Sequence, residues 1–223
     1  MPTPEQRIQI ETERGGVTGA LAVPRGATAM LVIAHGAGGT LDAPFLVGLT
    51  RAMNTERIAT LRFNFLYSEA GRRAPDPELR LREAWRGAFA VARKRAKERP
   101  VFVGGKSLGG RIASMCVADG ELDATGLVFL GYPLHPPGKP EKIRDAHLYD
   151  VKAPMLFLQG TSDPFAKPDR LRPVIAKLKK RATLVPIEGG DHSFRVKGAK
   201  RDDREIGASL APDTVAFIRK VGG

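Results

Sequence analysis

Apolar and polar positions along the chain predict strands and helices in regular succession. Two alternating stretches, at 7–13 and 17–24, are separated by Arg-Gly-Gly and predict an antiparallel hairpin. After it, short apolar runs alternate with segments in which apolar residues recur at helical spacing. This alternation predicts an α/β sheet that is mostly parallel, with helices on both faces. The expected strands are 29–39, 58–65, 101–106, 126–133, 153–160 and 182–190, and the expected helices are 43–56, 76–99, 111–118, 167–181 and 211–223.

The helix at 76–99 has the clearest start and stop signals. Asp76 is expected to be its N-cap, with Pro77 at the first helical position and Glu78 just after. Pro100 ends it, because proline cannot continue a helix. No internal repeat or interdomain linker interrupts the chain, so we expect one domain over residues 1–223.

Composition narrows the class of protein. Hydrophobic residues make up 42% of the 223, which is ordinary for a globular protein. The single cysteine, Cys116, excludes an internal disulfide and a cysteine-rich zinc site, and it fits a reducing compartment. The N-terminal stretch does not resemble a signal peptide, and no apolar run is long enough to span a membrane. We therefore expect a cytoplasmic protein with no membrane partner.

The net charge of +12 is unusual and has two interpretations. Basic residues cluster at 92–99, 177–181 and 195–204, which could attract nucleic acid or an anionic substrate. The first two clusters also fit the solvated ends of helices, where cations suit the helix dipole. No nucleic-acid motif accompanies the charge, and aromatic residues are only 6%. We therefore favour solvated helix ends and do not expect nucleic acid as a partner; a homodimer is left open.

The stretch VFVGGKSLGGRIAS at 101–114 contains the pattern Gly-x-Ser-x-Gly between an expected strand and an expected helix. This is the arrangement of a nucleophile elbow, a turn so sharp that larger side chains beside the serine would clash. Ser107 is therefore the candidate nucleophile. Because glycine is common in this chain, with 25 residues, the pattern also requires a base, an acid and an oxyanion hole elsewhere.

The candidate base and acid each follow an expected strand. His192 lies after the last strand and is the only one of four histidines in the position that the order Ser, acid, His requires. Asp163 lies in the loop after the preceding strand and would orient the imidazole. Asp163 could instead be a turn residue before Pro164. Asp191 is the other candidate acid, but neighbouring loop residues rarely face each other, so we prefer Asp163.

An oxyanion hole needs two backbone N–H groups. Leu108, at the start of the helix after Ser107, would supply the first. The glycine-rich loop at 35–39 would supply the second, from Ala37 or, as second choice, Gly38. His35 would hold this loop by hydrogen bonds, in preference to a direct catalytic role. Together these parts predict acyl transfer through an acyl-enzyme, with no metal or organic cofactor.

The motifs at 35–39, 104–114, 131–140, 158–165 and 189–194 together give the chain a family resemblance. It resembles the α/β-hydrolases, particularly their dienelactone-hydrolase-like branch. More closely, it is similar to hydrolases related to the human testis-expressed and NSL-complex hydrolase-like proteins. The dienelactone enzymes use a cysteine nucleophile, so Ser107 departs from them and leaves their substrate in doubt. The resemblance also includes proteins that act as interaction scaffolds, so a weakly active or inactive scaffold, associated with nucleic acid through its basic surface, is the alternative function.

The expected substrate is a small ester, as for a carboxylesterase. Residues 132–153 leave room for a loop but not for a cap domain, so we expect an open, shallow site lined by loops 37–45, 64–75 and 132–150. Lys106 and the net charge indicate a carboxylate- or phosphate-bearing ester, unless Lys106 only reaches solvent. The candidate substrate contacts are Lys106, Gly38, Tyr67 and Leu134, and a small apolar pocket would be formed by Leu41, Phe45, Leu66, Tyr67 and Leu134.

Overall fold

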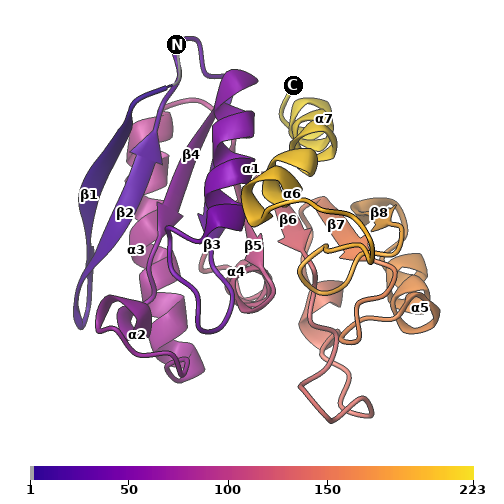
Figure 1. Cartoon of the computed structure of the whole chain (residues 1–223). Helices are drawn as coiled ribbons and strands as arrows, with labels where there is room; N and C mark the ends of the chain where they lie inside the picture. Colours follow the sequence, from indigo (N-terminus) through magenta and orange to yellow (C-terminus); the bar gives the residue numbers. More distant parts are fainter. Residues whose placement is uncertain (1–2) are drawn as a thin grey trace.

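An eight-stranded sheet runs through the centre of the molecule (Figure 1). The structure is a computed structural model and describes residues 3–223. The strands follow the order β1-β2-β4-β3-β5-β6-β7-β8; β2 pairs antiparallel with both β1 and β4, and all other pairs are parallel. The predicted hairpin and mostly parallel sheet are therefore confirmed. The strands are β1 (Glu5–Thr12), β2 (Gly15–Ala22), β3 (Ala29–Ala34), β4 (Ile58–Phe63), β5 (Val101–Lys106), β6 (Gly126–Leu130), β7 (Met155–Gly160) and β8 (Ala182–Ile187).

Helices cover both faces of the sheet, as Figure 1 shows. The helices α1, α6 and α7 pack on one face, whereas α3, α4 and α5 pack on the other. Side chains alternate between the two faces along a strand. In β3, Leu31 and Ile33 therefore pack in the core under α1, α6 and α7, whereas Met30 and Val32 pack in the core under α3, α4 and α5. The helices are α1 (Pro44–Thr55), α2 (Leu66–Glu69), α3 (Glu78–Ala96), α4 (Leu108–Ala118), α5 (Pro168–Leu178), α6 (Asp203–Ser209) and α7 (Ala211–Gly222), with short 3-10 helices η1 (Ala146–Tyr149) and η2 (Lys179–Arg181).

The sheet reverses its winding at β3. This strand pairs with β4 on one side and with β5 on the other, so the connections that follow β3 and β5 leave the sheet next to each other. Ala34, at the end of β3, is directly opposite Gly105 of β5. In open α/β sheets, ligands bind beyond the carboxyl ends of the strands at such a switch point. The loop at 35–39 and the turn at Ser107 meet at this place.

Helix α6 was not expected from the sequence, although a local signal for it is present. Asp202 and Glu205 form a capping box, in which each side chain accepts a hydrogen bond from the other residue's backbone N–H. Gly207 of α6 packs directly against the Phe45 carbonyl of α1, and Gly48 of α1 packs against the Arg204 carbonyl. A Cβ atom at either glycine would clash with backbone, so these two glycines permit the close contact of the two helices.

One capping prediction is wrong. The N-cap of α3 is Pro77, and Asp76 makes no cap hydrogen bond. The Asp76 carboxylate is instead buried and paired with Arg72 at 2.7 Å and with Arg80 at 3.7 Å. These arginines hold the carboxylate away from the free N–H groups of the helix, so ion pairing replaces capping.

The segment between β6 and β7 carries only η1, so residues 3–223 contain no cap domain above the sheet, as predicted. The basic cluster at 92–99 has Arg93, Lys94 and Arg95 in the last turn of α3, where all three are exposed. Within residues 3–223, none of the helices has both the length and the hydropathy needed to span a bilayer.

Candidate active site

Ser107 occupies a strained turn between β5 and α4. Its backbone has φ +50° and ψ −113°, a conformation that non-glycine residues rarely adopt. Gly105 and Gly109 make the turn feasible, because a Cβ at either position would lie 2.6 Å from the Ala34 carbonyl oxygen. The geometry is that of a nucleophile elbow, which presents the serine hydroxyl beyond the edge of the sheet.

A chain of hydrogen bonds joins Ser107, His192 and Asp163. The Nε2 atom of His192 lies 2.9 Å from Ser107 Oγ, and its Nδ1 atom lies 2.7 Å from Asp163 Oδ2. Because the carboxylate only accepts hydrogen bonds, Nδ1–H donates to Asp163, which leaves Nε2 free to accept from the serine hydroxyl. The Asp163 side chain is fully buried, whereas that of His192 is 21% exposed. These three predicted residues are brought together in the geometry of a serine hydrolase triad.

The buried carboxylate of Asp163 has two further donors. The Phe165 N–H donates to Oδ1 at 2.8 Å, and the Gln159 side-chain amide donates to Oδ2 at 2.5 Å. Gln159 is itself buried at the end of β7, and its Oε1 accepts the N–H of Tyr132. Gln159 thus fixes the carboxylate that faces His192. Gln159 was not predicted from the sequence.

Asp191, the alternative acid, is used to shape the loop. Its Oδ1 accepts the backbone N–H groups of Ser193 at 2.7 Å and Arg195 at 2.9 Å. These bonds close a turn around His192 and occupy the carboxylate, and the imidazole is bonded to Asp163 instead. The geometry therefore places Asp163, and not Asp191, at the ring.

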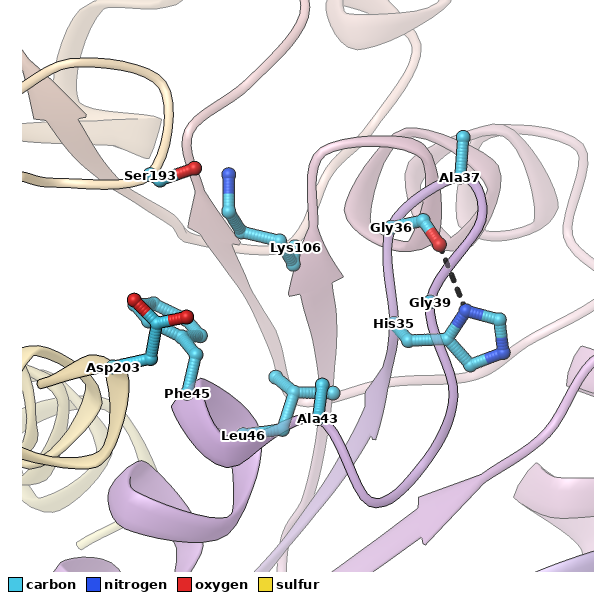
Figure 2. Close-up of a pocket in the computed structure, with 10 residues that line it drawn as sticks. All are labelled: His35, Gly36, Ala37, Gly39, Ala43, Phe45, Leu46, Lys106, Ser193 and Asp203. Carbon is cyan, nitrogen blue, oxygen red and sulfur yellow. Dashed lines mark hydrogen bonds between the residues drawn. The ribbon is translucent and has the colours of Figure 1, made fainter. Parts of the chain in front are cut away.

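The loop after β3 is anchored by His35, whose side chain is buried. Its Nδ1–H donates to the Gly36 carbonyl at 2.8 Å, a bond drawn in Figure 2, and its Nε2 accepts from the Phe65 N–H at 3.3 Å. Burial lowers the pKa of His35 to about 4, so the ring is neutral at pH 7. His35 thus has the loop-holding contacts that were expected of it.

The two expected oxyanion donors line the same cavity as Ser107 and His192. Leu108 begins α4, and the first N–H groups of a helix have no acceptor within the helix. Ala37 lines the same cavity from the exposed part of the loop at 35–39. The cavity has a volume of about 380 Å³, and its wall also includes Pro133, Phe165 and Ser193. Gly38, the second choice, is exposed and lines neither this cavity nor its neighbour.

A smaller, mostly apolar cavity adjoins the first one (Figure 2). It has a volume of about 180 Å³ and is walled by Ala43, Phe45 and Leu46 of the loop and helix after β3. Lys106 and Ser193 line both cavities. Asp203, from the first turn of α6, closes part of the wall beside Phe45. A substrate at Ser107 therefore meets a small apolar recess on one side.

Lys106 lines both cavities and is held by protein groups. Its ammonium donates to the backbone carbonyl of His192 and lies 5.5 Å from the centre of the Phe194 ring. Burial lowers the pKa of Lys106 to about 8, although the charges of Asp163 and Asp191 oppose the shift. The side chain thus ties the histidine loop to the elbow instead of extending freely into solvent.

A family model described as an alpha/beta hydrolase domain matches residues 27–219. The chain belongs to this family. Its structure is similar to that of a dienelactone hydrolase from Anabaena variabilis ATCC 29413, with a TM-score of 0.79, 21% identity and 100% coverage of both chains. It is also similar to a lidless α/β serine hydrolase from Xanthomonas campestris, with a TM-score of 0.76, 18% identity and coverage of 99% of this chain and 96% of that one. An esterase from Pyrococcus furiosus has a TM-score of 0.76 and 14% identity, with coverage of 99% and 92%. At these identities the similarity establishes the fold.

Several expected substrate contacts of this α/β hydrolase do not reach its cavities. Tyr67 and Leu134 are both fully buried, and neither lines the cavity at Ser107 or its neighbour. Tyr67 packs beside His35, and its hydroxyl donates to the Gly36 carbonyl. Leu41 is likewise buried, and Leu66 lines a separate surface cavity. Of the residues predicted to form an apolar pocket, only Phe45 lines one of the two cavities.

Besides Gln159, three residues at the site of this α/β hydrolase were missed from the sequence. The Phe165 ring lies against His192, with centroids 4.6 Å apart, and flanks the imidazole. Arg111 of α4 and Arg144 of the loop after β6 line the larger cavity. Arg111 lies four residues after Ser107, a helical spacing that placed it one turn from the nucleophile. Within residues 3–223, no group of three His, Cys, Asp or Glu side chains is arranged to hold a metal ion.

Proposed function

We propose that this α/β hydrolase is a serine hydrolase that cleaves a small carboxylic ester through an acyl-enzyme. The observation that carries the proposal is the hydrogen-bonded chain Ser107–His192–Asp163 at a strained elbow that opens into a cavity. The esterase and serine hydrolase among the similar structures support the same reaction class. The closer relationship to the testis-expressed and NSL-complex hydrolase-like proteins, and the cytoplasmic location, are further proposals from the sequence.

In this mechanism Ser107 Oγ attacks the acyl carbonyl carbon while its proton passes to His192 Nε2. The imidazolium then gives that proton to the alcohol oxygen as the carbon–oxygen bond breaks. Asp163 keeps Nδ1 protonated and stabilises the positive ring. Water enters, loses a proton to Nε2 and attacks the acyl-enzyme, which releases the acid and restores Ser107.

The negative oxygen formed at each attack would be held by the backbone N–H groups of Leu108 and Ala37. Leu108 is at the positive end of α4, whose dipole also favours the negative charge. Removing one such donor in a serine protease costs roughly 3–4 kcal/mol of barrier. The bonds of His35 to Gly36 and Phe65 hold the loop that carries Ala37, so the donor is placed before the substrate arrives.

The decisive experiment compares Ser107→Ala with the parent enzyme. A fluorophosphonate probe reacts with an activated serine and requires no knowledge of the substrate. We expect the parent to be labelled and to hydrolyse p-nitrophenyl acetate, and Ser107→Ala to do neither while keeping its thermal midpoint. Ser209→Ala, on α6, is the matched control and should label like the parent. A parent that folds but stays unlabelled and hydrolyses no ester would favour the scaffold function instead.

A further inference from the structure

The cavity in front of Ser107 has a strong excess of positive charge. Three cationic side chains, Lys106, Arg111 and Arg144, contribute to its wall, and none of the described residues that line it is an aspartate or glutamate. Asp163 lies behind His192 and is fully buried. Lys106 donates its ammonium to the His192 carbonyl, so the two arginines are the groups that face a substrate.

Arg111 and Arg144 have no acidic partner within residues 3–223, unlike Arg62, Arg82 and Arg86. Arg62 is paired with Glu5 at 2.8 Å, and Arg82 and Arg86 both bind Glu121. By contrast, the Nε atom of Arg111 is buried and has no hydrogen-bond partner. A buried guanidinium N–H without an acceptor is costly, so the protein itself leaves the side chain of Arg111 incompletely satisfied.

The charges of the two arginines act on their surroundings. Burial, followed by the charge of Arg111, lowers the pKa of Arg144. Burial and the charge of Arg111 also lower the pKa of His147, to about 4. Asp119 and Asp145 oppose this shift of His147 but do not reverse it, so the positive charge of Arg111 prevails there. An anion in the cavity would be attracted by both guanidinium groups at once.

The backbone fixes where this anion would sit relative to the reacting carbonyl. Arg111 is in the first turn of α4, and its N–H donates to the Ser107 carbonyl at 3.1 Å. Side chains on a helix lean toward its N-terminus, which here is the end that carries Ser107. Arg144 comes from the loop after β6, where its N–H donates to the Leu134 carbonyl at 2.7 Å. The anion would lie within a few bonds of the scissile ester.

We propose that Arg111 and Arg144 bind an oxyanion, a carboxylate or a phosphate monoester, carried by the ester substrate of Ser107. This inference rests on the proposed serine hydrolase function. Guanidinium groups suit the role, because their planar N–H pairs match the oxygen pairs of carboxylates and phosphates. The site thus selects an anionic small ester over its neutral analogue.

Matched esters test the preference. The anionic 4-acetoxybenzoate and 4-acetoxyphenyl phosphate are compared with neutral methyl 4-acetoxybenzoate, and mono-p-nitrophenyl glutarate with its neutral methyl ester. The first set carries the anion on the leaving group and the second on the acyl group. We expect kcat/KM to be at least tenfold higher for an anionic ester than for its neutral analogue in one of the two sets. Whichever of 4-acetoxybenzoate and 4-acetoxyphenyl phosphate has the higher kcat/KM identifies the preferred anion. Equal kcat/KM for anionic and neutral esters in both sets would overturn the proposal.

Variants assign the preference to the two arginines. In Arg111→Gln and Arg144→Gln, the anionic-to-neutral ratio of kcat/KM should fall toward one. Arg93→Gln, an exposed residue of α3, removes the same charge elsewhere and should keep the parent ratio. If Arg111→Gln does not fold, Arg111→Lys replaces it. Because lysine keeps the charge but not the planar N–H pairs, this variant should retain part of the preference for the anionic ester. A parent-like ratio in both folded arginine variants would contradict the assignment.

A binding measurement separates this proposal from the proposed function. Ser107→Ala is titrated by calorimetry with 4-hydroxybenzoate and with phenyl phosphate, and no turnover is needed. We expect one of these two anions to bind, and its affinity to fall at least tenfold when Arg144→Gln is added to Ser107→Ala. This result would support the anion site even if the parent hydrolyses no ester. Ester hydrolysis by the parent with no anion binding in Ser107→Ala would leave the proposed function intact and overturn the anion site.

Discussion

Asp163 Oδ2 lies 2.7 Å from His192 Nδ1, although 29 residues separate the two along the chain. The contact follows from the sheet, because β7 and β8 are parallel neighbours and each residue lies in the segment that follows its strand. Asp191, next to His192 in sequence, instead accepts N–H groups of its own loop. Position in the sheet therefore decides which carboxylate orients the imidazole.

Replacing the two acids in turn should have very different effects. Asp163→Asn is expected to lower kcat for p-nitrophenyl acetate by about 10⁴-fold, as the equivalent change does in a serine protease, because the amide no longer fixes the tautomer. Asp191→Asn keeps an oxygen that can accept the N–H groups of Ser193 and Arg195, so its loss should be far smaller. Similar losses in the two variants would show that Asp163 is not the orienting acid.

Gln159 should act on the reaction through Asp163. Gln159→Leu removes a donor to a buried carboxylate, and hydrogen bonds to charged groups contribute about 1.5–3 kcal/mol. We expect kcat to fall at least about tenfold, since 1.4 kcal/mol corresponds to a factor of ten. The control is Gln6→Leu, an exposed position of β1. A Gln159→Leu variant that folds and turns over like the parent would remove Gln159 from the positioning network.

The order of motifs along the chain was enough to predict that the three candidate triad residues lie together. Ser107, Asp163 and His192 each follow a strand, and parallel strands bring their carboxyl ends to one edge. Whether a side chain near the site points into the cavity or into the core depends on segments distant in sequence. For this reason Tyr67 and Leu134 were wrongly predicted to contact the substrate. Arg111 was predicted to be in a helix, but the sequence did not show that Arg144, from the loop after β6, lines the same cavity.

Acid should destabilise the fold through His35. Its pKa is about 4 in the folded chain and 6.5 when unperturbed, because burial disfavours the charged ring. Between these values the unfolded chain binds a proton that the folded chain does not, so the free energy of unfolding falls as pH drops from 6.5 to 4. We expect His35 alone to make the free energy of unfolding about 2 kcal/mol lower at pH 5 than at pH 7.

Urea unfolding of the parent and of His35→Gln at pH 7 and pH 5 measures this contribution. The glutamine does not titrate, so the difference between the two pH values should be smaller in the variant by roughly the same 2 kcal/mol. His147 titrates over the same range, with its pKa also lowered to about 4, and its contribution remains in both proteins. Identical pH dependence in parent and variant would mean that His35 is not a buried neutral ring.

The apolar recess beside Lys106 should limit the length of the acyl chain. Each methylene that is buried contributes about 0.8 kcal/mol, but only while an apolar wall remains to bury it. The recess holds about 180 Å³, and the carboxylate of Asp203 forms part of its wall. We therefore expect kcat/KM for p-nitrophenyl esters to fall as the acyl chain lengthens from four carbons to twelve. Phe45→Ala enlarges the recess and should move the preference toward longer chains, whereas a parent series that rises below the micelle threshold would indicate an additional groove and a lipase or thioesterase.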